Sequence, residues 1–167
     1  VRYNDQQHYE NDVYFVDPSI FKVFTFPLLK GDVTHALALP NNVVITEDIA
    51  KKYFGEDDPM GKNITINGSE WLVSGVLAPL PQHIHLKFDI LLPFEAFRVP
   101  FGYPVTLQDW GWISFHTYIL LREGEDAQTL ENQLPEFVRT HWSEDRAKRF
   151  RFELQSLEDI YLGEPQH

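Results

Sequence analysis

The sequence has no cysteine, few basic residues and no long apolar run, and each absence excludes a class of protein. Without cysteine the chain cannot form a disulfide framework, a thiolate nucleophile or a thiolate zinc site. Its 14 basic and 25 acidic residues give a net charge of −11, the wrong sign for a protein that binds nucleic-acid backbones or anionic lipid head groups. We therefore expect no nucleic-acid partner.

The apolar residues also never form the run of about 18 that a membrane-spanning helix needs. The first residues lack the basic region and following apolar stretch of a signal peptide. Both ends are polar and look unlike natural termini, so we expect an excised domain. The absence of cysteine fits the cytosol and the bacterial periplasm equally well.

What the sequence does contain is enough apolar material for a folded core. Hydrophobic residues make up 43% and aromatic residues 14%, including thirteen Phe, which excludes a disordered chain. A chain of 167 residues buries about 70% of the surface that it exposes when unfolded. We expect one ordinary domain or two small lobes that share a core.

The pattern of apolar residues predicts strands and helices that interleave irregularly. Asp17 followed by Pro18 predicts the N-cap and first turn of a short helix, Thr46 caps a helix that ends at Gly55, and a third helix begins at Ala127. Pro135 is expected to break that last helix into two pieces. Strands are expected at residues 13–16, 43–45, 63–66, 70–77, 88–92, 113–121 and 150–154. This order favours an α+β fold with mixed sheets.

Two details of the central hairpin are specific. Asn67 and Gly68 form the dipeptide that type I′ turns prefer, and Gly75 in the returning strand indicates a β-bulge.

Motifs that carry chemistry are weak or incomplete. The loop 55–63, GEDDPMGKN, fails as a phosphate-binding loop, because its glycines are too far apart, Asn63 replaces the hydroxyl residue and three acids would repel phosphate. The same loop lacks the ligand pattern of a calcium site. His83 and His85 with Asp89 remain an open possibility for a metal, although a hydrogen-bonding loop histidine is the simpler interpretation. Paired-carboxylate hydrolysis is also open. We predict no catalytic, cofactor or metal residues.

The segment between residues 94 and 112 is rich in aromatic side chains, which supply large contact areas at low entropic cost. One interpretation is that it contacts a partner; the other is that its rings fill the seam between two lobes. The candidate contact residues are Phe94, Phe97, Phe101, Tyr103, Trp110 and Trp112.

Three segments together resemble the MacB-like periplasmic core domain of FtsX-type ABC transporter permeases. They are VDPSIFKVFTFPLLKGD, NNVVITEDIAKKYFGEDDPMGKNITINGSEWLVSGVLAPLP and HLKFDILLPF, and the resemblance covers about residues 13–97. Ile20 and Ile84 depart from the family pattern. The residues that fill the family's structural motif include Pro18, Phe21, Gly31, Tyr53, Phe54, Gly55, Pro59, Gly61, Gly75, His85 and Asp89.

The resemblance implies a non-catalytic, cofactor-free periplasmic domain between the first two membrane helices of a bacterial inner-membrane permease. It implies a cytoplasmic ABC ATPase subunit, a permease homodimer or heterodimer, and a periplasmic protein or exported substrate as partners. It also implies two lobes: residues 1–35 with 113–167 near the membrane, and 36–98 as an inserted lobe, joined by a loop at 99–112. The alternatives are a stand-alone periplasmic binding module and, less favoured, a small hydrolase.

Overall fold

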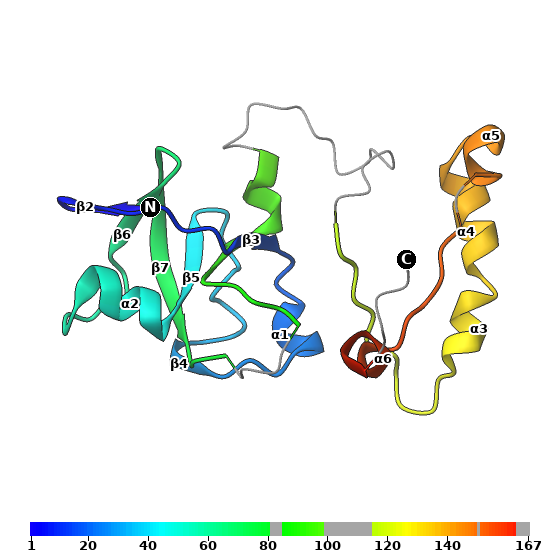
Figure 1. Ribbon diagram of the computed structural model, residues 1–167, viewed down its shortest axis with the longest axis horizontal. Coiled ribbons are helices and arrows are strands. Elements are labelled where there is room, and N and C mark those ends of the chain that lie inside the picture. Colours follow the sequence, from blue (N-terminus) through cyan, green and yellow to red (C-terminus); the bar gives the residue numbers. More distant parts are fainter. Residues whose placement is uncertain (81–84, 99–114, 150, 163–167) are drawn as a thin grey trace. The chain divides into compact units, whose positions relative to one another are not determined.

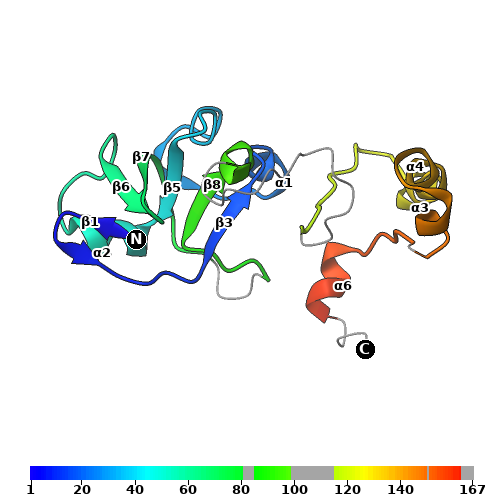
Figure 2. The same ribbon diagram turned by 90° about the horizontal axis from the view of Figure 1, so that it is seen from above.

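The strands of the N-terminal part pair into one mixed sheet, as the α+β prediction requires. The computed structural model describes residues 1–80, 85–98, 115–149 and 151–162, and it divides the chain into two compact units, Val1–Val105 (unit 1) and Thr106–His167 (unit 2). Figures 1 and 2 show the sheet and its helices in unit 1 and the helices of unit 2.

Unit 1 is built on a sheet of eight strands in the order β2-β1-β6-β7-β5-β8-β3, with β4 paired to β7. Parallel pairs join β3 to β8 and β5 to β7, and the other pairs are antiparallel. The strands are β1 (Arg2–Tyr3), β2 (Gln6–Gln7), β3 (Val13–Val16), β4 (Leu28–Gly31), β5 (Asn42–Thr46), β6 (Asn63–Ile66), β7 (Ser69–Leu77) and β8 (Ile90–Pro93).

Strand β7 is the centre of this sheet because it pairs along both of its edges. One edge meets β5, and the other meets β6 with its first half and β4 with its second half. The β6–β7 hairpin turns at Asn67 and Gly68, whose φ angles of 49° and 83° confirm the predicted turn. The register against β5 shifts beside Gly75, which confirms the predicted bulge.

The core of unit 1 lies between the sheet and helix α2 (Glu47–Phe54), which covers one face of it (Figure 1). Thr46 caps α2 by accepting a hydrogen bond from the Ile49 amide, and Gly55 ends it with a φ of 61°. Both ends agree with the sequence prediction. The apolar stripe of α2 packs on the β5, β7 and β8 side chains, so the helix and the central strands form one packed body.

The first helix begins later than expected. Helix α1 (Ile20–Val23) begins after Ser19, and Phe24 is already extended. Asp17 does not cap this helix; its carboxylate accepts from the Ser19 amide, which closes a turn before the helix begins. The predicted N-cap was therefore wrong by two residues. The N-terminal hairpin of β1 and β2 and strand β4 were not predicted.

Unit 2 consists of short helices and extended segments. Its helices are α3 (Ala127–Glu131), α4 (Leu134–His141), α5 (Glu144–Ala147) and α6 (Leu157–Leu162). Pro135 lies in the first turn of α4, which confirms the predicted break. The strands expected at 113–121 and 150–154 were wrong for the described residues 115–121 and 151–154, which are extended without a pairing strand.

The two units differ sharply in burial. Val138 is the one buried side chain among the described residues of unit 2, which also holds seven of the twelve exposed large hydrophobic side chains in the described chain. Nothing in this division tests the predicted grouping of residues 1–35 with 113–167, which stays a prediction. Every helix in the described residues is too short or too polar to cross a lipid bilayer.

Candidate functional site

The aromatic segment expected to contact a partner begins in a short 3₁₀ helix, η1 (Phe94–Arg98), directly after β8. Phe94 and Phe97 stack with centroids 6.0 Å apart, and Phe97 meets the edge of Phe15 on β3 at 5.2 Å. Phe15 in turn lies 6.4 Å from the buried Trp71. Both η1 rings are half-buried, so they serve at least in part to cover the sheet.

The other four candidate contact residues, Phe101, Tyr103, Trp110 and Trp112, lie outside the described residues. The partner-contact prediction for the whole segment therefore stays a prediction.

Two glycines of the predicted family motif face each other where β4 pairs with β7. Gly31 is the register partner of Gly75 and has a φ of 94°, a conformation that side chains rarely adopt. A Cβ atom at Gly31 would lie 2.5 Å from the carbonyl oxygen of Ser74. The close approach of these two strands thus requires glycine at position 31.

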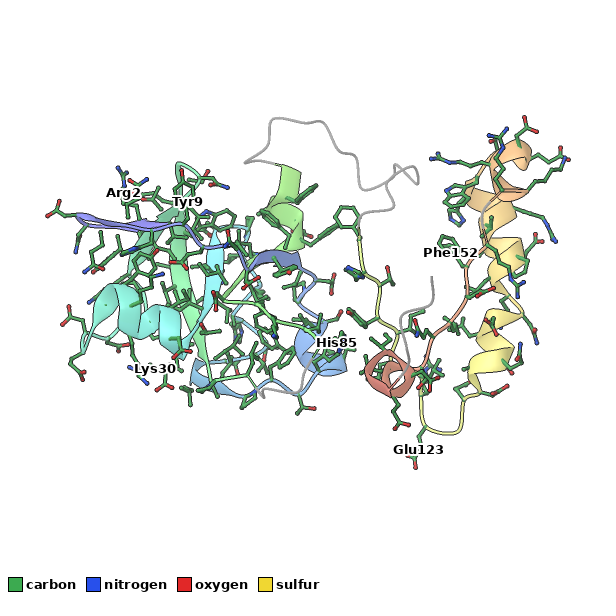
Figure 3. All side chains as sticks on the ribbon, in the orientation of Figure 1. Arg2, Tyr9, Lys30, His85, Glu123 and Phe152 are labelled. Carbon is green, nitrogen blue, oxygen red and sulfur yellow. The ribbon has the colours of Figure 1, made fainter. Side chains whose placement is uncertain are left out.

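The acidic loop after α2 is a turn held by surface ion pairs. Asp57 accepts from Lys62, and Asp58 accepts from Lys30 on β4, both at 3.0 Å. Lys62 also lies over the ring of Phe54, 5.6 Å from its centroid. Lys30 is labelled in Figure 3. These contacts give Asp57 and Asp58 a structural role as partners of nearby lysines.

Pro59 and Gly61 shape the return of this loop to the sheet. Pro59 is buried, and its carbonyl accepts from the Lys62 amide. The Gly61 amide donates to Val73 on β7, which places the loop against the central strand. Pro18 is exposed in the turn before α1, and Phe21 is half-buried on that helix.

His85, labelled in Figure 3, lies in an aromatic cluster. Its ring is 6.2 Å from Phe24, Phe24 stacks on Phe26, and Phe26 meets the edge of Phe88 at 5.2 Å. Phe24, Phe26 and Phe88 are buried. This packing gives His85 a structural place beside buried aromatic rings, and the interpretation as a hydrogen-bonding loop histidine stays a prediction.

Asp89 lies beside other carboxylates at the start of β8. Burial, and then the negative charges of Asp12 and Glu10, raise the pKa of this carboxyl above its usual range. The backbone of Asp89 is fixed on both sides, because its amide donates to Asp12 and its carbonyl accepts from Thr46.

Sequence reasoning missed one polar cluster, formed by Glu10, Lys52 and Tyr53. The Glu10 side chain is 6% exposed and accepts from the Tyr53 hydroxyl at 2.6 Å and from the Lys52 ammonium at 2.7 Å. Burial alone raises the pKa of Glu10, but these two hydrogen bonds and the charge of Lys52 bring that pKa below its usual value. The partners are more than forty residues apart, so no local pattern could reveal them.

Neither cluster has the composition of a metal centre. Within the ranges that the structure describes, no group of three His, Cys, Asp or Glu side chains could hold a metal ion. His83, one of the possible ligands considered from the sequence, lies outside those ranges. What the described geometry offers is a well-packed sheet unit with charged surface turns.

Comparison with known proteins supplies the remaining observations. The family model of the MacB-like periplasmic core domain matches residues 1–137. A search of curated proteins finds no significant match.

Two solved structures share the fold. A domain assigned to a permease protein from Porphyromonas gingivalis has a TM-score of 0.63 and 21% identity, over 96% of this chain and 73% of that one. The periplasmic region of MacB from Actinobacillus actinomycetemcomitans has a TM-score of 0.55 and 17% identity, over 89% of this chain and 62% of that one.

Proposed function

Because this chain belongs to the family of MacB-like periplasmic core domains, we propose that it passes ATP-driven conformational changes of an ABC transporter permease to a partner or substrate outside the cytoplasmic membrane. The chain is a periplasmic domain of a MacB/FtsX-like permease, and its family is one of transporter domains and not a class of enzymes. The family match over residues 1–137 is the observation that carries the proposal. We also propose that the domain itself catalyses no reaction.

The build of unit 1 supports a mechanical role. Every residue of β5 and β8 is buried, as is the last part of β7 from Gly75 to Leu77, and α2 packs across these strands, so the unit resists internal deformation. A body of this kind transmits a displacement without absorbing it. Its surface loops can then present different contacts to a partner in two states of the transporter.

The full-length protein would act with other subunits. We propose a cytoplasmic ABC ATPase subunit, a second permease copy or a related permease, and a periplasmic protein or exported substrate as partners. The family's place among ABC transporter permeases supports the first two. The aromatic residues between positions 94 and 112 are the proposed contact with the periplasmic partner.

The proposal is tested by purifying the full-length protein from membranes. We expect an ATPase subunit to co-purify with the full-length protein. The purified complex, which includes unit 1, should hydrolyse ATP. Failure to recover an ATPase in several detergents would contradict the permease function.

The partner contact has its own test. Trp110→Ala and Trp112→Ala are expected to weaken capture of the periplasmic partner while the ATPase still co-purifies. The matched control is Trp142→Ala, which changes a tryptophan outside the contact segment. Unchanged capture by both contact variants, with the domain folded, would show that the aromatic segment is not the contact.

A further inference from the structure

Unit 2 is acidic as a whole, with six basic and twelve acidic residues, but one short segment of it concentrates positive charge. Residues 139–151 hold five of the fourteen basic residues of the chain and only two acidic ones, although the whole chain carries −11. The basic residues are Arg139, Arg146, Lys148, Arg149 and Arg151. A local field of this sign attracts anions even where the net charge repels them.

Four of these side chains line one cleft of about 800 Å³, a volume within the range of small-molecule sites. The cleft lies between the helices α3, α4 and α5 and the extended residues that follow, which run back beside the helices (Figure 1). The Leu154 amide donates to Glu131 of α3 at 3.2 Å and so ties that extended segment to the helices. The basic lining residues are Arg139, Lys148, Arg149 and Arg151.

The remaining lining is partly apolar. Val138, 5% exposed, forms a buried part of the wall, and Pro135, Ala147 and Phe152 add further apolar surface. Phe152, labelled in Figure 3, also lies 5.4 Å from the Trp142 ring. The cleft therefore presents cations and hydrocarbon surface together, which suits a ligand with both kinds of group.

The existing ion pairs in the cleft leave the cations accessible to a ligand. Arg139 pairs with Glu136 at 2.8 Å, Lys148 with Glu144 at 2.8 Å and Arg151 with Glu153 at 3.2 Å. The six side chains are 65% to 85% exposed. Exposed pairs of this kind contribute little and exchange readily for a stronger anion. Among the ion pairs of the described residues none involves Arg149, and its guanidinium can bind a phosphate in bidentate fashion.

Two acids also line the cleft and limit the charge that it can accept. Glu131 is occupied by the Leu154 amide, and Glu144 by Lys148. They oppose a highly charged ligand, and they favour a single phosphate group over a polyanion.

We propose that this cleft binds an amphipathic phosphate, a molecule in which one phosphate group adjoins an apolar chain. The phosphate contacts Arg149 and Lys148, and the chain lies against Phe152 and Val138. A membrane phospholipid and a free lipid phosphate share this chemistry. The proposal is independent of the permease function, because it rests on residues of unit 2 alone.

The test is a titration of the ¹⁵N-labelled 167-residue chain with dihexanoyl phosphatidylglycerol below its micelle concentration. Saturable amide shifts are expected in residues 134–154. Glycerol phosphate, which lacks the chain, and dihexanoyl phosphatidylcholine, which lacks net charge, are each expected to bind about tenfold more weakly or worse.

Matched charge reversals locate the site. Arg149→Glu is expected to weaken binding about tenfold, whereas Arg122→Glu, an exposed residue of unit 2 outside the cleft, leaves it unchanged. Where Arg149→Glu does not fold, Arg149→Gln gives the same comparison. Phe152→Ala is expected to reduce the preference for phosphatidylglycerol over glycerol phosphate.

Flotation with phosphatidylglycerol vesicles separates the two sources. Co-flotation that Arg149→Glu abolishes supports a bilayer phospholipid, and binding of the short-chain lipid without co-flotation supports a free amphiphile. Non-saturable shifts, equal loss in the Arg122 and Arg149 variants, or binding of glycerol phosphate as strong as that of the lipid would each overturn the proposal.

Discussion

Replacing Gly31 by alanine should destabilise unit 1 more than any local propensity suggests. The φ of 94° at this position costs a side-chain-bearing residue roughly 1–2 kcal/mol. The added Cβ would also lie 2.5 Å from the Ser74 carbonyl oxygen and 3.0 Å from the Gly75 Cα. Both are backbone atoms of the central strand, so relief requires moving a strand, at about 1–3 kcal/mol more.

Gly61→Ala is the matched control for this change. Gly61 also has a positive φ, 73°, but a Cβ there would meet no heavy atom within 4 Å. It should therefore show the conformational cost alone, roughly 1–2 kcal/mol. The difference between the two variants isolates the steric contact between β4 and β7.

The assay is urea unfolding followed by circular dichroism in the β-sheet region. We expect Gly31→Ala to lower the free energy of unfolding by about 2–5 kcal/mol. That is a large share of the roughly 5–15 kcal/mol by which a domain is stable. The slope of the free energy of unfolding against urea concentration should be unchanged. Equal losses in the two variants would refute the close approach of the strands.

Three further predictions concern charge and local stability. Glu10→Gln should destabilise unit 1 by about 1–3 kcal/mol at neutral pH, because the amide replaces a charged acceptor of Lys52 and Tyr53. In the unmodified chain the folded-state pKa of Glu10 is lowered, so its contribution to the free energy of unfolding is fully present above its unfolded-state pKa. That contribution disappears as the pH falls through the folded-state pKa. A free energy of unfolding by urea that does not change with pH would contradict this. Asp89→Asn should stabilise the unit at neutral pH, because the folded-state pKa of Asp89 is raised. The gain in stability should vanish in acid, below the unfolded-state pKa of Asp89, and thermal melts at several pH values measure it. Amide hydrogen exchange should be much slower in the central strands of unit 1 than in α3 and α4, since Val138 alone is buried in the described part of unit 2, and equal protection would count against the division.

Local signals predicted the elements whose stabilising contacts are near in sequence. The cap at Thr46, the stop at Gly55, the turn at Asn67 and Gly68, and the break at Pro135 each depend on a few neighbouring residues. Backbone conformation at such points is set by side-chain acceptors, by positive φ and by the proline ring.

The elements that were missed depend on distant partners. Strand β4 is a strand because its residues pair with β7, more than forty residues away along the chain. Conversely, residues 115–121 and 151–154 have strand-like composition, but alternation alone supplies no hydrogen-bonding neighbour. The same reasoning explains the polar cluster at Glu10, which only the folded sheet assembles.

The absence of cysteine makes the central claim directly measurable, because single labelling sites can be introduced into the domain. Asn67 in the β6–β7 turn and Glu56 after α2 are exposed positions of unit 1. Spin labels at Asn67→Cys with Glu56→Cys report distances within the unit, and Asn67→Cys alone reports the distance between two copies in an assembled permease.

The decisive measurement is double electron–electron resonance on the full-length permease with its ATPase. It compares the nucleotide-free complex with the complex trapped with ATP. If unit 1 transmits motion as a rigid body, the distance between copies changes with nucleotide while the distance within the unit stays the same. Identical inter-copy distances in the two states, or a change confined to the interior of unit 1, would contradict the proposed function.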